Sequence, residues 1–226
     1  MTGNIVNFSA ILVGSVIGLL FKSKIPQRIN NIMVEGLGLG IIIYGISQGI
    51  KTINPLIIFA SLAIGAIIGE IIDIEKKLNH LGEYFQNKMK KSKNVAQGFV
   101  TASLLFCVGA MAIMGALQSG LQGEHDILFA KAFLDGTISV IFSSAMGVGV
   151  ILSSITVFVY QGIIIVLSGM VKPYLAVAVI NEMTAVGGVL ICGIGLNMLE
   201  IKKFKLGNLI PAVFIPIIIH IIFPFS

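Results

Sequence analysis

Residues 127–171 read ILFAKAFLDGTISVIFSSAMGVGVILSSITVFVYQGIIIVLSGMV, an almost unbroken apolar run. A helix that crosses the hydrocarbon core of a bilayer needs only about 20 residues, because that core is about 30 Å thick and each residue rises 1.5 Å. The run is too long for one span, and Gly147-Val148-Gly149 divides it near its middle. It therefore predicts two spanning helices, over 128–147 and 150–170.

Six further apolar runs have the length of a spanning helix. They cover 4–21, 30–50, 54–73, 97–119, 174–197 and 206–224. The chain of 226 residues is 56 % hydrophobic and 11 % charged, with a mean hydropathy of +1.01, whereas a soluble domain is about 25 % charged. This composition excludes a soluble enzyme, a nucleic-acid-binding domain and a disordered chain. It predicts an all-α, polytopic transmembrane helix bundle of eight spans, one integral membrane domain over residues 1–226 within the lipid bilayer.

The basic residues indicate the orientation of these spans. Twelve of the fifteen follow the first, third or seventh run: Lys22, Lys24, Arg28, Lys76, Lys77, Lys88, Lys90, Lys91, Lys93, Lys202, Lys203 and Lys205. With eight spans these twelve share one side, which the positive-inside rule makes cytoplasmic. Merging 128–147 with 150–170 would spoil that asymmetry. We therefore expect a multi-pass membrane protein with both termini outside, and the net charge of +5 gives no reason to expect a nucleic-acid partner.

The longest loop, 74–96, is predicted to be cytoplasmic. Its apolar residues Leu78, Leu81, Phe85 and Met89 recur every three to four residues among lysines. On a helix they share one face, which favours an amphipathic helix lying in the anionic inner leaflet. A docking site for a partner protein is the alternative.

Two patterns of repetition bear on the architecture. Lys24-Ile25-Pro26 followed by Glu35 matches Lys172-Pro173 followed by Glu182 at an offset of 147 or 148. This would pair the first and second spans with the sixth and seventh as inverted repeats, which are typical of transporters. Because glycine and isoleucine are abundant here, chance similarity is the alternative. Glycines four residues apart at Gly14/Gly18 and Gly65/Gly69 favour close helix packing and are compatible with a homodimer.

Ionisable and amide side chains inside these runs are the candidate site residues, since a charged group in hydrocarbon costs about 2 to 3 kcal/mol or more. Glu182 lies deep in the seventh run beside Asn181, and a buried brace between helices is its alternative role. Asp135 lies one helical turn after Lys131, so an ordinary i,i+4 contact is its alternative. The set of candidates is Glu182, Asn181, Asp135, Asn7, Gln161 and Glu35. Glu70 and Asp73, in contrast, are expected to be solvated at a helix end.

No enzyme motif or cofactor-binding pattern is present in the sequence. His80, His125 and His220 are scattered and have no metal-ligand spacing, and whether any metal binds stays open. The glycine runs lack the lysine that follows a phosphate-binding loop. Cys107 and Cys192 lie in apolar runs, as small packing residues do.

Three segments resemble a known family. They are residues 101–111, the run from Leu134 through Gly147-Val148-Gly149 to Gly162, and the run from Glu182 to Asn197. These are similar to domain of unknown function 554, the YqgA/YdfK-like bacterial membrane proteins, and the likeness covers nearly the whole chain. The resemblance implies a bacterial inner-membrane protein of the kind suspected of transport. It assigns neither a substrate nor a functional residue.

The sequence thus favours a transporter or channel for a small solute or ion, linked to a cation or proton through the intramembrane carboxylates. Glu182 with Asn181, together with Asp135, Asn7, Gln161 and Glu35, would line a polar site between two halves of the bundle. The single arginine, Arg28, lies in a loop, which weighs against an anion clamp within the membrane. The alternative is a non-transporting membrane module that acts as a structural or regulatory partner.

Overall fold

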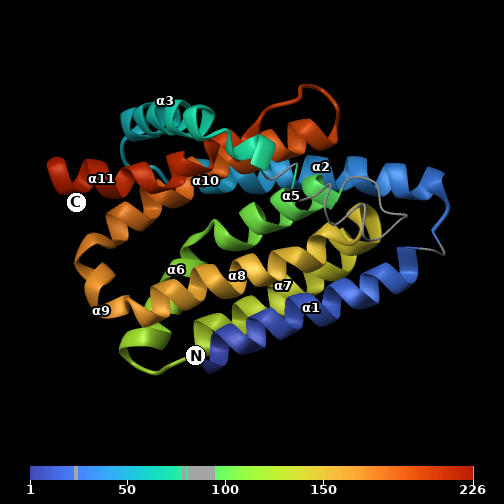
Figure 1. The fold of residues 1–226 in the computed structure, drawn as a ribbon, viewed down its shortest axis with the longest axis horizontal. Coiled ribbons are helices and arrows are strands. Elements are labelled where there is room, and N and C mark those ends of the chain that lie inside the picture. Colours follow the sequence, from blue (N-terminus) through green and yellow to red (C-terminus); the bar gives the residue numbers. More distant parts are fainter. Residues whose placement is uncertain (23–24, 78–79, 81–94, 226) are drawn as a thin grey trace. The chain divides into compact units, whose positions relative to one another are not determined.

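The structure is a computed structural model that describes residues 1–22, 25–77, 80 and 95–225, and its elements are helices (Figure 1). In chain order these are α1 (Thr2–Lys22), α2 (Gln27–Gly49), α3 (Pro55–Ile72), α5 (Val95–Cys107), α6 (Ala110–Leu121), α7 (Asp126–Met146), α8 (Gly149–Val166), α9 (Ser168–Val171), the 3₁₀ segment η1 (Lys172–Tyr174), α10 (Val177–Met198), the 3₁₀ segment η2 (Leu206–Phe214) and α11 (Ile215–Ile222). The interfacial helix predicted within 74–96 lies almost entirely outside the described residues.

Six helices in the described part of the chain are long and apolar enough to cross a membrane: α1, α2, α3, α7, α8 and α10. The pair α5 and α6 adds a seventh if the two together form one bent span. Large apolar side chains such as Ile43, Ile71 and Phe133 are exposed on these helices, as contact with lipid requires. The chain is therefore a multi-pass membrane protein.

Two predicted spans differ from the expectation. The expected continuous helix over 97–119 is wrong, because the chain bends by 59° between α5 and α6. Gly109 at the bend has φ +140°, a conformation that suits glycine and that hydropathy does not reveal. The run 206–224 forms a 3₁₀ segment followed by a short α-helix, because Pro211 and Pro216 supply no backbone N–H for a regular α-helix.

The predicted break between the spans 128–147 and 150–170 is confirmed. α7 ends at Met146, where the amide of Gly147 donates a last hydrogen bond to the Ser143 carbonyl, and Gly147 takes φ +88°. α8 begins at Gly149, whose Cα lies so close to the backbone of Val95 that a side chain would collide with it. Both glycines are required here, one for its dihedral angle and one for its size.

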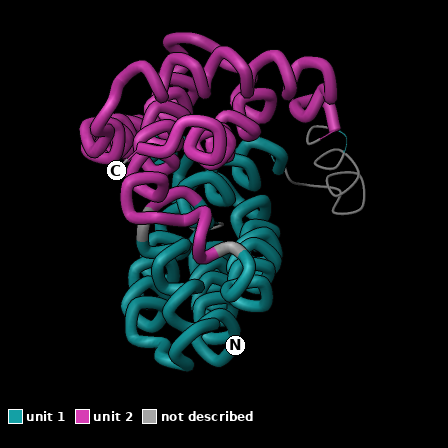
Figure 2. Tube along the Cα trace, turned by 90° about the vertical axis from the view of Figure 1, so that its left-hand side faces the viewer, with its two compact units in different colours: residues 1–34, 78–107, 111–170 teal, residues 35–77, 108–110, 171–226 magenta. Residues whose placement is uncertain are grey.

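The chain divides into two compact units, which Figure 2 shows in different colours. Unit 1 comprises Met1–Val34, Leu78–Cys107 and Met111–Met170, and unit 2 comprises Glu35–Lys77, Val108–Ala110 and Val171–Ser226. Each unit draws on separated stretches of sequence, so each core is built from helices that are distant along the chain.

In unit 1, α1 runs parallel to α7 and antiparallel to α8. Gly14 lies against the carbonyl of Gly136 and Gly18 against that of Val140, so residue numbers rise together along α1 and α7. Against α8 the order reverses, because Gly162 lies against the Asn4 side chain whereas Phe8, one turn further along α1, packs its ring against the Phe158 ring at 5.5 Å; the two helices run in opposite directions (Figure 1). The helices α5 and α6 follow α8 in the same direction, from Gly149 beside Val95 to Ile165 and Ser168 beside Gly120.

In unit 2, both helix pairs are antiparallel. Gly38 of α2 lies against Gly195 of α10, and Gly45 lies against Gly188 and Cys192. Gly65 and Gly69 of α3 lie against Ala212 and Asn208 of η2. The glycines on which a homodimer was predicted, Gly14/Gly18 and Gly65/Gly69, therefore pack within the chain. They give no support to a dimer, which stays a prediction.

Candidate functional site

The centre of unit 1 holds a buried ion pair on one helix. The Lys131 ammonium lies 2.7 Å from Asp135 Oδ2 and 2.9 Å from Oδ1, and the two side chains are only 8 % and 6 % exposed. The i,i+4 contact considered from the sequence is thus confirmed. Asp135 is nine residues into the 21-residue α7, about 14 Å along it, and so lies near the middle of this candidate spanning helix.

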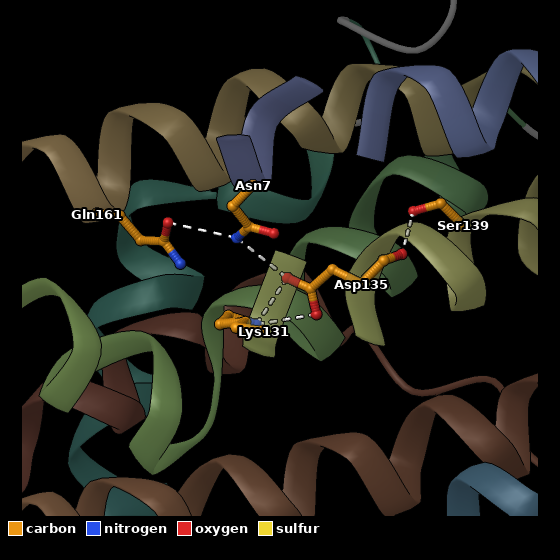
Figure 3. Close-up of polar contacts among 5 residues, drawn as sticks. All are labelled: Asn7, Lys131, Asp135, Ser139 and Gln161. Carbon is orange, nitrogen blue, oxygen red and sulfur yellow. Dashed lines mark hydrogen bonds and ion pairs between the residues drawn. The ribbon is translucent and has the colours of Figure 1, made fainter. Parts of the chain in front are cut away.

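Two amide side chains complete this cluster from neighbouring helices (Figure 3). Asn7 of α1 donates through Nδ2 to Asp135 Oδ2 at 3.2 Å and to Gln161 Oε1 of α8 at 3.3 Å, and both amides are fully buried. The Ser139 hydroxyl donates to the Asp135 carbonyl at 2.6 Å. We call Asn7, Lys131, Asp135 and Gln161 the Asp135 cluster; its side chains come from three helices, α1, α7 and α8.

Two polar atoms of this cluster have no hydrogen-bond partner among the described residues. They are Asn7 Oδ1, an acceptor, and Gln161 Nε2, a donor with two N–H groups. Buried polar groups in proteins are nearly always paired, so each unpaired atom calls for an explanation. In the view of Figure 3 the Gln161 nitrogen points toward the side on which the Lys131 ammonium lies.

The surroundings of the ion pair include a thiol and a phenol. The Cys107 thiol at the end of α5 lies within electrostatic reach of both Lys131 and Asp135, and Tyr160 of α8 interacts with Cys107. Removing one partner of a buried ion pair costs about 3–5 kcal/mol, because the other charge is left uncompensated. The contributions of Lys131 and Asp135 to stability therefore depend strongly on each other.

Glu182 makes its contacts elsewhere, within unit 2. It is fully buried on α10, and its Oε2 accepts from the Thr52 hydroxyl at 2.7 Å. Its Oε1 accepts from the backbone amides of Ile53 at 2.6 Å and Asn54 at 3.1 Å. Asn54 in turn caps α3 by accepting from the Leu56 amide at 3.1 Å. Glu182 therefore ties the loop between α2 and α3 to α10, the brace that the sequence left open as its alternative role.

The remaining candidates are less enclosed. Asn181, next to Glu182 on α10, is half-buried, and Glu35 is exposed on α2. Both belong to unit 2. Of the six predicted site residues, the structure thus brings three into direct contact in unit 1, namely Asn7, Asp135 and Gln161.

Sequence reasoning left several partners out of the site. Lys131 was considered only as a neighbour of Asp135, although a lysine one turn from a carboxylate in an apolar run was a usable signal. Thr52 and Asn54 precede Pro55, a pattern typical of a helix start, but two of the three donors to Glu182 are backbone amides. A backbone N–H donor cannot be recognised from the pattern of side chains in the sequence.

A third polar cluster joins α3 to η2 in unit 2. Glu70 is exposed as predicted, but it also accepts from Lys205 at 2.9 Å and from the Asn208 amide at 2.6 Å. The hydrogen bond to Glu70 raises the pKa of the Lys205 ammonium above its ordinary value. Because both charged side chains are largely exposed, this pair contributes little stability. Glu75 adds a bond of 2.7 Å from the Gly207 amide.

The donor set limits the chemistry of these clusters. Among the described residues no three His, Cys, Asp or Glu side chains are grouped as metal ligands. The Asp135 cluster instead contains one carboxylate, one ammonium and two amides. Such a set can exchange a proton and can bind a small polar or charged species through hydrogen bonds.

Comparison with known proteins supports the membrane assignment. The family model described as "Protein of unknown function (DUF554)" matches residues 2–221. The chain is 36 % identical over 231 residues to the uncharacterized membrane protein YdfK of Bacillus subtilis (strain 168), covering 100 % of this chain and 99 % of that protein. It is 33 % identical over 217 residues to the uncharacterized protein YqgA of Escherichia coli (strain K12), covering 93 % and 92 %. No solved structure matches the chain.

Proposed function

The chain belongs to the DUF554 family of membrane proteins, and on that premise we propose that it transports a small solute or ion across the bacterial inner membrane. The Asp135 cluster would couple this transport to a proton or cation. One observation carries the proposal: a buried Lys131–Asp135 pair lies near mid-depth of a spanning helix, beside two unpaired amide atoms. Ionisable groups are costly in a membrane interior and commonly mark transport pathways and proton relays.

Glu182 has a different place in this proposal than the sequence suggested. Among the described residues, the three donors that reach its carboxylate come from one loop, so its role is to hold that loop. This contact favours the second candidate function, a non-transporting module with structural braces. A purely structural protein, however, has no evident need for a buried ion pair, because apolar side chains of similar volume are usually as stable or more so.

We propose that the chain crosses the membrane eight times, with α5–α6 and η2–α11 as the fourth and eighth spans. In that arrangement odd-numbered spans run inward and even-numbered spans run outward. Helix direction within each unit supports this. α1 and α7, the first and fifth spans, are parallel, whereas α1 and α8 are antiparallel. If α5–α6 did not cross, α7 would have to run opposite to α1. The positive-inside rule then places both termini outside.

The same contacts support inverted repeats at an offset of 148. Shifting α1 and α2 by 148 residues brings them onto α8 and α10, and shifting Pro55–Ile72 gives 203–220, which overlaps Leu206–Ile222. Each helix contacts its own counterpart in an antiparallel manner, α1 with α8, α2 with α10 and α3 with η2. A two-fold axis in the membrane plane would produce such antiparallel pairs.

The experiment that tests transport uses purified protein in liposomes that contain a pH-sensitive dye. Sodium chloride, potassium chloride and sodium lactate are added outside in turn, and the internal pH is followed. We expect at least one of them to change the internal pH with the wild type and none with Asp135→Asn. Lys51→Met is the matched control, because Lys51 is exposed and bonds Gln48 outside the Asp135 cluster. If no species moves while the protein remains folded, transport is wrong.

A further inference from the structure

On the side where Lys131 and Gln161 lie, the Asp135 cluster has more hydrogen-bond donors than acceptors (Figure 3). The Lys131 ammonium carries three N–H groups, and the two bonds that it makes within the described part of the chain go to the same carboxylate. Gln161 Nε2 adds two further N–H groups that have no acceptor among the described residues. A ligand that completes this side must therefore bring acceptor atoms.

The charge of the cluster limits what can enter. Lys131 and Asp135 together carry no net charge, and Asn7 and Gln161 add none. An uncompensated charge in a medium of low dielectric constant is unfavourable, so a charged ligand must enter together with its counter-charge. A cation would compete with the ammonium for the single carboxylate, whereas an anion has the ammonium as its partner once the carboxylate is neutralised.

From these two observations we propose that the Asp135 cluster binds a small monoanion together with one proton, so that the protein is an electroneutral proton–monoanion symporter. The proton neutralises the Asp135 carboxylate, and the anion takes its place as the acceptor for Lys131 and Gln161. This inference rests on the proposed transport function and names its substrate class. The lack of an intramembrane arginine weighed against an anion clamp, but the buried Lys131 supplies a positive charge for the anion instead.

The exchange of bonds is balanced. One proton adds to a carboxylate oxygen of Asp135, and the two N–H···O bonds from Lys131 to that carboxylate break. New bonds form from Lys131 Nζ and Gln161 Nε2 to the anion. The proton adds to Oδ1, and the new O–H of Asp135 donates to the anion, while Asn7 Nδ2 keeps its bonds to Asp135 Oδ2 and Gln161 Oε1. The net charge is zero before and after, and the unpaired Gln161 Nε2 gains a partner.

The groups that face Asp135 allow this exchange. Lys131 faces it from α7 and Asn7 from α1, with Gln161 of α8 bonded to Asn7. Cys107 of α5 is the other titratable group within electrostatic reach, and Tyr160 interacts with Cys107. The thiol and the phenol are neutral in the proposed cycle. Among the described residues that interact with Asp135, Lys131 is thus the one that can compensate an anion.

The first test measures binding by the full-length protein in detergent, with lactate and chloride as probes. The thermal unfolding midpoint is followed against probe concentration at pH about 5.5 and about 8. Because one proton binds with each anion, we expect the apparent Kd to rise about tenfold per pH unit where Asp135 is ionised. Lys131→Met and Gln161→Leu should weaken binding, and Lys51→Met should not.

Asp135→Asn gives the sharpest variant, because it imitates the protonated carboxylate without adding volume. It should bind the anion with little dependence on pH, since the carboxylate no longer competes for Lys131. If Lys131→Met fails to fold, Lys131→Met with Asp135→Asn restores neutrality and should fold without binding the anion. Binding with equal affinity at both pH values in the wild type, or no binding of either probe, overturns the proposal.

The second test separates this inference from transport itself. In liposomes, lactate or chloride uptake should follow an inward proton gradient and should not respond to a membrane potential set by potassium and valinomycin. Proton-linked movement of sodium or potassium, with no effect of either anion, would leave transport intact and overturn the symport of an anion. Proton-linked anion binding without any flux would support the assignment of the ligand and show that the proposal of transport is wrong.

Discussion

The Lys131 ammonium and the Asp135 carboxylate face each other at 2.7 Å, one turn apart on α7 and shielded from solvent. Asn7 of α1 donates to the same carboxylate, so this pair also joins two helices. The proposed function and the proposed substrate class both depend on this ion pair, and the first prediction concerns the effect of breaking it.

Breaking the pair from one side should destabilise the protein strongly. Asp135→Leu or Lys131→Met should each lower the free energy of unfolding by about 3–5 kcal/mol, because the remaining charge is buried without its partner. The double variant Lys131→Met with Asp135→Leu should recover most of that loss. Reversible unfolding of the four proteins in detergent gives the coupling energy as a double-mutant cycle. Additive effects of the two substitutions would contradict a coupled pair.

Glu182 should prove important for stability and unimportant for proton coupling. Glu182→Leu leaves the Thr52 hydroxyl and the Ile53 and Asn54 amides without their acceptor, and each lost bond of this kind costs about 1–3 kcal/mol. The thermal unfolding midpoint of Glu182→Leu should therefore be clearly lower than that of the wild type, and Thr52→Val should lower it less. The milder Glu182→Gln keeps an acceptor oxygen and should retain flux in liposomes. A complete loss of flux in folded Glu182→Gln would instead return Glu182 to the transport site.

The close approach of α1 to α7 can be tested at a single atom. A Cβ at Gly14 would collide with the Gly136 carbonyl, so Gly14→Ala should separate the two helices and destabilise the protein by about 1–3 kcal/mol. Gly36→Ala on α2 is the matched control, because nothing lies within 4 Å of its Cβ position. The control should be neutral or stabilising, since alanine has the higher helix propensity. Equal effects at both positions would argue against the packing of α1 on α7.

Topology can be read from single cysteines in a variant with Cys107→Ser and Cys192→Ser. Lys51→Cys should react with a membrane-impermeant thiol reagent added to intact cells, and Lys203→Cys should react only after the membrane is opened. Position 203 is decisive, because it is cytoplasmic when α5–α6 crosses the membrane and external when it does not. Labelling of Lys203→Cys in intact cells would therefore exclude the eight-span arrangement.

Much of the fold could be predicted because spanning helices are set by length and hydropathy. The break at Gly147-Val148-Gly149 followed from a run too long for one span, and the family membership followed from three segments of sequence. The bend at Gly109 could not be predicted in this way, since a kinked apolar run and a straight one have the same hydropathy. Pro211 and Pro216 were available signals for the irregular segment after Leu206, but the length of the apolar run outweighed them.

For the site, residue type was enough to identify the side chains that need a reason to lie in hydrocarbon: Asn7, Asp135 and Gln161 were all singled out by the cost of burying polar groups. That these side chains meet depends on how the helices pack, because their contacts join residues 128 and 154 positions apart. Helix packing also brings Glu182 to the backbone amides of a loop, which have no side-chain signature in the sequence. The cost of burial depends on residue type and is readable along the chain, whereas the partner that offsets it depends on which helices pack together.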